Sequence, residues 1–192
     1  QNFTKHITAP AWASQYTRAF HDMDGDGDLD VVTSSKEYDG SAQVERLRVY
    51  ENDGNQNFTT HIITTDADQA FNVYATDVDN DGDIDVLSAS GDDNKIAWYE
   101  NDGSQTFTAH TITTNASGAH SVYATDVDGD GDMDVLSASA SDDEIAWYEN
   151  DGSETFTAHT ITTDADYARS VYAADVDGDG DMDVLSASRL DD

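Results

Sequence analysis

The 192-residue chain contains no cysteine, a single proline and only 8 basic side chains. Without cysteine it can form neither disulfide bonds nor a metal site built on thiolates. No apolar run approaches the roughly 18 residues that a membrane-spanning helix requires, so we expect no membrane span. No secretory signal peptide is recognisable. Because the chain begins with Gln1 rather than Met, we expect it to be a piece of a longer protein.

The shortage of basic residues leaves a large excess of negative charge. The chain carries 41 Asp and Glu residues and a formal charge of −33. A surface of that sign repels phosphate backbones and anionic lipids, so we expect no binding to nucleic acid. High acidity can also indicate disorder. Here nine Tyr, six Phe and three Trp in regularly alternating segments indicate a folded domain instead.

A nine-residue run with Asp at positions 1, 3, 5, 7 and 9 and Gly at position 6 occurs four times. We call it the Asp loop; its copies are residues 22–30, 77–85, 126–134 and 175–183. Two carboxylates 4 Å apart repel each other by about 1 kcal/mol in water and about 4 kcal/mol at an effective dielectric of 20. Five carboxylates in so short a loop therefore indicate a bound cation. Hard oxygen ligands of this kind favour Ca²⁺.

The spacing suggests a role for each position of the Asp loop. In residues 126–134, alternate carboxylates at positions 1, 3 and 5 can point inward, and Gly131 permits a sharp turn. Asp132 would then offer its backbone carbonyl, and Asp134 would close the shell with both oxygens. This is the order of an EF-hand's first half, but position 12 is Ser or Thr instead of Glu, and strand-like residues follow. Position 4 is Gly or Asn, the residues that most readily adopt positive φ.

The alternative for these loops is a solvated acidic turn. Four copies in fixed register between apolar segments favour metal coordination over that alternative. We therefore predict about four Ca²⁺ ions, one in each Asp loop, which stabilise the fold because ion-binding free energy adds to folding free energy. The predicted ligands are Asp22, Asp24, Asp26, Asp28, Asp30, Asp77, Asp79, Asp81, Asp83, Asp85, Asp126, Asp128, Asp130, Asp132, Asp134, Asp175, Asp177, Asp179, Asp181 and Asp183.

The distance between Asp loops defines a repeat. The last three loops are 49 residues apart, and the first interval is 55 because six extra residues fall within 35–46. Each unit holds four short segments rich in β-branched, aromatic and small residues, such as 121–125, 133–139, 145–149 and 155–162. Four such strands joined by tight turns in a unit of about 50 residues are typical of a β-propeller blade. A β-sandwich, the alternative, does not repeat its sequence so closely.

We therefore predict an all-β protein: a β-propeller of four-stranded antiparallel blades, formed by one domain. Its repeats span approximately 9–63, 64–112, 113–161 and 162–192, with an N-terminal strand in 1–8. These segments add up to 15 strands, one fewer than four blades need. The chain can form a closed ring of about four blades, can be part of a larger ring, or can form a complete ring with a second chain. We favour a homodimer, because an open half-ring leaves two bare faces.

The segment 121–139 (SVYATDVDGDGDMDVLSAS) resembles the FG-GAP or VCBS-type repeat of integrin α-subunit propellers and of large secreted bacterial proteins. The resemblance covers essentially the whole chain. It implies a calcium-stabilised propeller with each ion held between the first two strands of a blade. The name-giving Phe-Gly pair is absent; residues 71–72, 120–121 and 169–170 stand near its place. The bacterial members are therefore more similar, which implies a secreted, extracellular or cell-surface protein.

Other repeated residues allow two interpretations. A histidine recurs in the fourth strand, either as a metal-binding ring or as a scaffold residue; we favour the scaffold for His6, His61, His110 and His159. Aromatic pairs in the third strand are either sugar-stacking platforms or packing between blades; we favour packing for Trp98, Tyr99, Trp147 and Tyr148. The links between fourth and first strands vary most, at 11–16, 66–71, 115–120 and 164–169, so that rim is either a ligand surface or drift.

From these features we predict a non-catalytic module used for adhesion, with a carbohydrate or protein ligand. The propeller of a calcium-dependent polysaccharide lyase is one alternative, and a structural spacer is another. No Ser-His-Asp set and no distinctive carboxylate pair stands apart from the repeats. Few Lys and Arg residues are available to hold an acidic glycan. We therefore expect no enzymatic activity.

Overall fold

The computed structural model describes residues 14–38, 40–41, 43–55 and 57–190. Within them fourteen strands form antiparallel sheets, each built from strands consecutive in the chain. The first sheet consists of β1 (Ser14–His21), β2 (Asp30–Tyr38), β3 (Gln43–Asn52) and β4 (Phe58–Thr64). The second consists of β5 (Ala70–Thr76), β6 (Asp85–Ser90), β7 (Lys95–Asn101) and β8 (Phe107–Thr113). The third consists of β9 (Ala119–Thr125), β10 (Asp134–Ser139), β11 (Glu144–Asn150) and β12 (Phe156–Thr162).

The fourth sheet has the two strands that the sequence predicts for residues 162–192. It contains only β13 (Ala168–Ala174) and β14 (Asp183–Ser188) among the described residues. The N-terminal strand predicted within residues 1–8 lies outside the part of the chain that the structure describes. The other strands predicted in the repeats are confirmed, because segments of this composition and turn spacing pair with their sequence neighbours.

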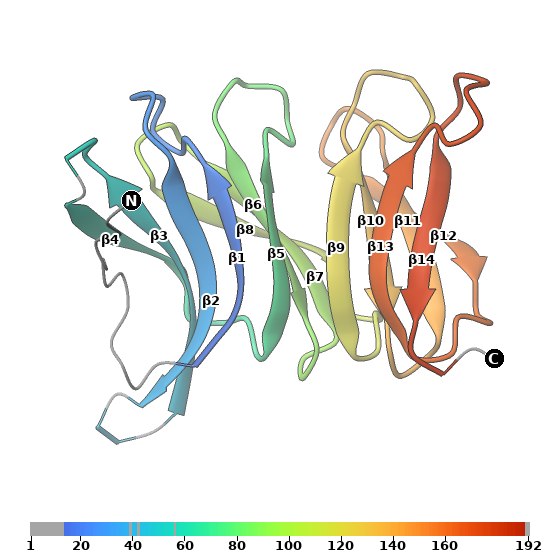
Figure 1. Cartoon of the computed structure of the whole chain (residues 1–192), viewed down its shortest axis with the longest axis horizontal. Helices are drawn as coiled ribbons and strands as arrows, with labels where there is room; N and C mark the ends of the chain where they lie inside the picture. Colours follow the sequence, from blue (N-terminus) through green and yellow to red (C-terminus); the bar gives the residue numbers. More distant parts are fainter. Residues whose placement is uncertain (1–13, 39, 42, 56, 191–192) are drawn as a thin grey trace, which may run out of the picture.

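The sheets stand side by side in chain order, with the first and the fourth at opposite ends of the row (Figure 1). Their first strands, β1, β5, β9 and β13, contact one another in succession, whereas the outer strands β4 and β8 contact each other far less. The sheets therefore fan out from the first strands, as propeller blades do. Within the described residues the row does not close into a ring (Figure 1).

The core lies between neighbouring sheets. Leu87 and Trp98 of the second sheet are fully buried against Val122 and Val135 of the third. Burying one such side chain contributes about 1.5–3 kcal/mol. Tyr99 and Tyr148 are also buried, and Trp147 packs against the fourth sheet, so these aromatics are packing residues and not sugar platforms.

The repeated histidines are scaffold residues, as predicted. The Nε2 atoms of His61, His110 and His159 lie 2.6, 2.8 and 2.7 Å from a glutamate oxygen of the neighbouring third strand. His110 and His159 also stack on tryptophans of that strand, with ring centroids 4.4 and 4.7 Å apart. His6 lies outside the described residues.

The six extra residues of the first repeat form strand instead of a polar link. They lengthen β2 and β3, which remain paired without interruption out to Tyr38 and Gln43. In the second repeat the corresponding strands separate at Ser90 and Lys95. The first sheet therefore carries a hairpin that extends beyond its neighbours.

Candidate metal centres

Each Asp loop joins the first and second strands of its sheet, as the sequence predicts. The loop brings the carboxylates of positions 1, 3 and 9 together, with one oxygen of each within 4.8 Å of the others. The four triads are Asp22, Asp24 and Asp30; Asp77, Asp79 and Asp85; Asp126, Asp128 and Asp134; and Asp175, Asp177 and Asp183.

Hydrogen bonds within the loop curl the chain around each triad. In the second loop, the backbone N–H of Gly82 donates to Asp77 Oδ2 at 3.0 Å, and that of Asp81 donates to Asp79 Oδ1 at 3.1 Å. The other three loops repeat both bonds at 2.9–3.2 Å. Since carboxylates at positions 1 and 3 attract backbone donors, alternate side chains point to one centre.

Position 4 adopts the positive φ that the sequence predicts. Its φ is 75° at Gly25, 62° at Asn80, 80° at Gly129 and 80° at Gly178. Asn is one of the few residues besides Gly that tolerate this region. Asn80 in the second loop therefore adopts the same backbone conformation as the glycines at this position of the other loops.

The carboxylate of position 9 ties the loop to the third strand of its sheet. Asp85 accepts the backbone N–H of Val78 at 2.9 Å and that of Asn101 at 2.8 Å. The Asn101 side chain also donates to the carbonyl of Met23 in the first Asp loop at 3.2 Å. The backbone N–H groups of Asn52 and Asn150 likewise donate to the position-9 carboxylates of their own sheets, each at 2.8 Å. Sequence reasoning missed the hydrogen bonds of these asparagines to the loops, although Asn-Asp-Gly recurs at 52–54, 101–103 and 150–152.

Burial makes these carboxylates costly to charge. Asp30, Asp85 and Asp134 are no more than 1% exposed, and this desolvation raises the pKa of each of them above the usual range for Asp. The pKa of Asp85 rises to about 6. A divalent cation held between the triad's oxygens would restore the ionised form.

Positions 5 and 7 stand outside the triads. Asp81, at position 5, accepts the backbone N–H of Asp83 at 2.8 Å. The carboxylate of Asp83, at position 7, lies against Gly103 in the turn after β7, where a Cβ atom would collide with it. The same contact recurs between Asp28 and Gly54 and between Asp132 and Gly152. Sequence reasoning missed the role of these glycines, which leave room for a loop carboxylate.

Two unpartnered oxygens show how well the triads fit a cation. Oδ1 of Asp22 and Oδ1 of Asp77 are buried and have no hydrogen-bond partner. A buried carboxylate oxygen without a partner costs about 1–3 kcal/mol or more, and a hard divalent cation supplies what the backbone does not. In the third and fourth loops the corresponding oxygens accept Gly129 N–H at 2.7 Å and Gly178 N–H at 2.6 Å. The donor set, three carboxylates with further loop oxygens nearby, is compatible with a calcium ion.

The variable links lie beside one another along the opposite rim. Phe71 stacks on His120 with ring centroids 4.7 Å apart, and His120 in turn contacts the guanidinium of Arg169. The sequence placed these three residues in successive links, but they lie in the first strands β5, β9 and β13 and join neighbouring sheets. The first link, 11–16, falls largely outside the described residues, and nothing is described of its side chains.

Comparison with known proteins agrees with the loop geometry. No curated protein matches the chain. The described part of the chain contains no helix that is long and apolar enough to cross a membrane. The model of the FG-GAP-like repeat matches three overlapping segments, 22–88, 77–137 and 126–186, each of which starts at position 1 of an Asp loop. The chain belongs to the FG-GAP-like repeat family.

Proposed function

We propose that this chain is a calcium-stabilised β-propeller module of a secreted or cell-surface protein, used for adhesion through a carbohydrate or protein ligand. The observation that carries the proposal is the fourfold convergence of three carboxylates, with buried unpartnered oxygens at Asp22 and Asp77. Repeats of this family are typical of extracellular, generally non-enzymatic proteins. Calcium is available outside cells at the concentrations that weaker extracellular sites need.

The role of the ion follows from the contacts of the loop. The carboxylates of positions 1, 3 and 9 would hold it, and it would supply positive charge among them. Asp85 links its loop to β7 and, through Asn101, to the loop of the preceding sheet. Neutralising the triads would therefore stabilise each hairpin and the seams between sheets together.

A calcium titration tests this proposal. The protein is stripped with EDTA, dialysed and titrated with CaCl₂ in a calorimeter, and we expect about four ions per chain. The Asp77→Asn variant should lose one of them. Absence of binding heat, or a melting curve that EDTA leaves unchanged, would refute the proposal. An array of glycans and extracellular proteins, probed with and without Ca²⁺, then separates a ligand-binding module from a spacer.

The exposed face of the fourth sheet supports completion of the ring by a second copy of the chain. Leu87 and Leu136 are fully buried by the next sheet, whereas their counterpart Leu185 is 43% exposed. Val176 and Tyr172 beside it are 64% and 52% exposed. Sedimentation in Ca²⁺ should show a homodimer that the Leu185→Asp variant dissociates; a monomer at all concentrations would contradict this arrangement. The lyase alternative gains no support from the described residues.

A further inference from the structure

We propose that the extended β2–β3 hairpin, together with the link between β4 and β5 and the loop between β6 and β7, forms a binding site for an uncharged saccharide unit. This inference rests on the proposed function of a ligand-binding module and assigns its ligand class and place. The hairpin contains the only long insertion among the repeats. Since repeats two and three pack without it, the scaffold does not require these residues.

The two faces of the extended hairpin differ in chemistry. Side chains alternate between faces along a strand, and directly paired residues share a face. Lys36 pairs with Glu45, and Tyr38 pairs with Gln43, so these four side chains lie on one face. Ser34, on the same face, donates its hydroxyl to the carbonyl of Ala70 at 2.6 Å, so this face is turned toward the second sheet.

The opposite face of the hairpin is a buried ion cluster. Glu37, only 4% exposed, accepts a hydrogen bond from Arg46 at 2.9 Å and pairs with both terminal nitrogens of Arg48. This cluster lowers the pKa of Glu37 through the hydrogen bonds from Arg48. A rigid support reduces the entropy that a ligand must overcome on binding. The cluster therefore holds the other face in place for a ligand.

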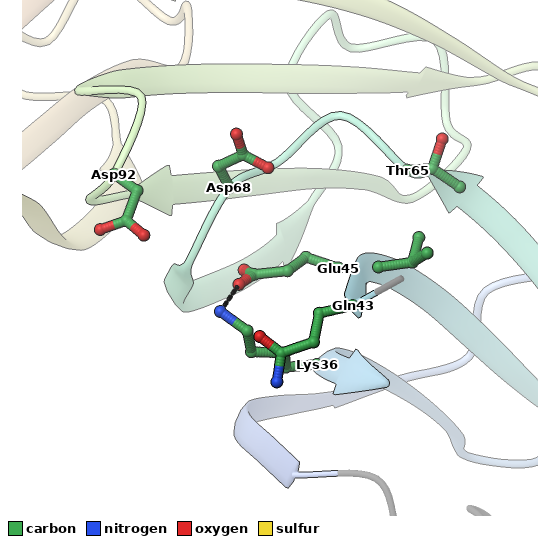
Figure 2. A pocket seen from close by; sticks show the side chains of 7 residues that line it. Lys36, Gln43, Glu45, Thr65, Asp68 and Asp92 are labelled. Carbon is green, nitrogen blue, oxygen red and sulfur yellow. Dashed lines mark ion pairs between the residues drawn. The ribbon is translucent and has the colours of Figure 1, made fainter. Parts of the chain in front are cut away.

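A cavity of about 380 Å³ lies between that face and the second sheet. Figure 2 shows Lys36, Gln43 and Glu45 on the hairpin side, and Asp68 and Asp92 on the loops across from them. Lys36 and Glu45 form an ion pair at 2.8 Å (Figure 2). Glu45 also accepts the backbone N–H of Gln69. Apart from Val44, every residue that lines the cavity offers a polar side-chain group: Lys36, Gln43, Glu45, Thr65, Asp68 and Asp92.

This lining suits sugar hydroxyls better than other ligands. Hydroxyls both donate and accept hydrogen bonds, and the cavity offers carboxylate acceptors, an ammonium donor and an amide that does both. Tyr38, 57% exposed, is the cross-strand partner of Gln43 on the same face and offers an aromatic surface to the apolar side of a sugar ring. Three carboxylates against one ammonium disfavour anionic sugars. The volume fits one or two sugar units and is too small for a folded partner.

The test uses the full calcium-loaded chain, isotope-labelled for NMR and titrated with methyl glycosides of neutral hexoses, N-acetylhexosamines and uronic acids. We expect resonances of Lys36, Gln43 and Glu45 to shift with a neutral glycoside. Tyr38→Ala and Gln43→Ala should each weaken binding by about tenfold. Phe20→Ala is the matched control, because Phe20 is an equally exposed aromatic, 60%, of the same sheet outside the cavity. This variant should bind as the parent does.

The charge argument has its own variant. The double substitution Asp68→Asn and Asp92→Asn removes two negative charges from the cavity and should improve uronide binding by about tenfold. Neutral glycosides that shift no resonance, or affinities that Tyr38→Ala and Gln43→Ala leave unchanged, would overturn the inference. If glycans bind at another surface, the inference fails while the proposed function stands. If the Asp loops take up no calcium, the proposed function itself fails.

Discussion

The third and fourth Asp loops, with the strands that follow, have identical sequences over residues 126–139 and 175–188 but lie in different surroundings. Asp134 is 1% exposed and Leu136 is fully buried, whereas Asp183 is exposed and Leu185 is 43% exposed. Both loops nevertheless form the same triad and the same turn. The conformation of each loop thus depends on residues close in the sequence, whereas its burial depends on the neighbouring strands and sheets.

The difference arises from the neighbours of each loop. β10 pairs with β11 as well as β9, and its outer face is covered by the fourth sheet. The backbone N–H of Asn150 on β11 donates to Asp134 at 2.8 Å. β14 pairs only with β13 within the described residues. Identical residues therefore differ in desolvation and in how much their replacement should lower the free energy of unfolding.

Calcium removal should have the largest effect, and the exposed fourth loop should respond before the buried third loop. An ion present at 1,000 times its Kd stabilises a site that exists only in the folded state by about 4 kcal/mol. We expect EDTA to lower the Tm steeply and hydrogen exchange to rise first in the fourth loop. A uniform rise across loops three and four would show that burial does not matter to ion retention.

Truncating the equivalent leucines of the third and fourth sheets should give the second-largest effect on stability. Leu136→Ala should destabilise the calcium-loaded chain by about 3 kcal/mol because it leaves a cavity in a packed seam. Leu185→Ala should cost less than about 1 kcal/mol in the monomer, because half-exposed side chains have less apolar surface to lose. Urea unfolding at low protein concentration measures both. Equal costs would mean that the fourth sheet is covered in solution.

The calcium-free protein should lose stability as the pH rises. The folded pKa of Asp85 lies at about 6, above its ordinary value of 3.8, so its contribution is fully present below about pH 4 and is lost as the pH rises through about 6. The effect is on the order of 2–3 kcal/mol. Urea unfolding in EDTA at pH 4 and pH 7 measures it, with Asp85→Asn as the variant in which this dependence should shrink. Asp183→Asn is the exposed control, which should leave it unchanged.

Replacing the last aspartate of the third or fourth loop by Asn should give the smallest difference in stability between the two loops. In Asp134→Asn the amide can accept only one of the two backbone N–H bonds, which leaves a buried donor unpaired at a cost of about 1–3 kcal/mol. In Asp183→Asn water replaces the lost acceptor, so we expect less than about 1 kcal/mol. Thermal melts in EDTA isolate this effect from ion binding. A larger loss for Asp183→Asn would reverse the ranking that burial predicts.

The features that the sequence predicted correctly depend on the spacing of residues close in the chain. Alternating Asp with Gly or Asn at position 4 predicted a curled loop, and Asn80 with φ 62° confirms the backbone constraint. The strands, the turns and the packing role of Trp98 also followed from short-range patterns. The sequence did not show which three of five aspartates converge, because positions 5 and 7 alternate just as regularly. It also did not show that the insertion forms strand rather than a polar link.

The amino-acid sequence by itself determined the repeat, the strands and the conformation of each Asp loop, because these depend on φ preferences and hydrogen bonds between residues a few positions apart. Only the tertiary structure decided which loops are buried, which asparagine reaches each carboxylate and where the extended hairpin leaves a cavity. Those features depend on the neighbouring strand or sheet, and the same fourteen residues at 126–139 and 175–188 meet different neighbours. Burial, and with it the energy of each carboxylate, is therefore a property of position in the fold.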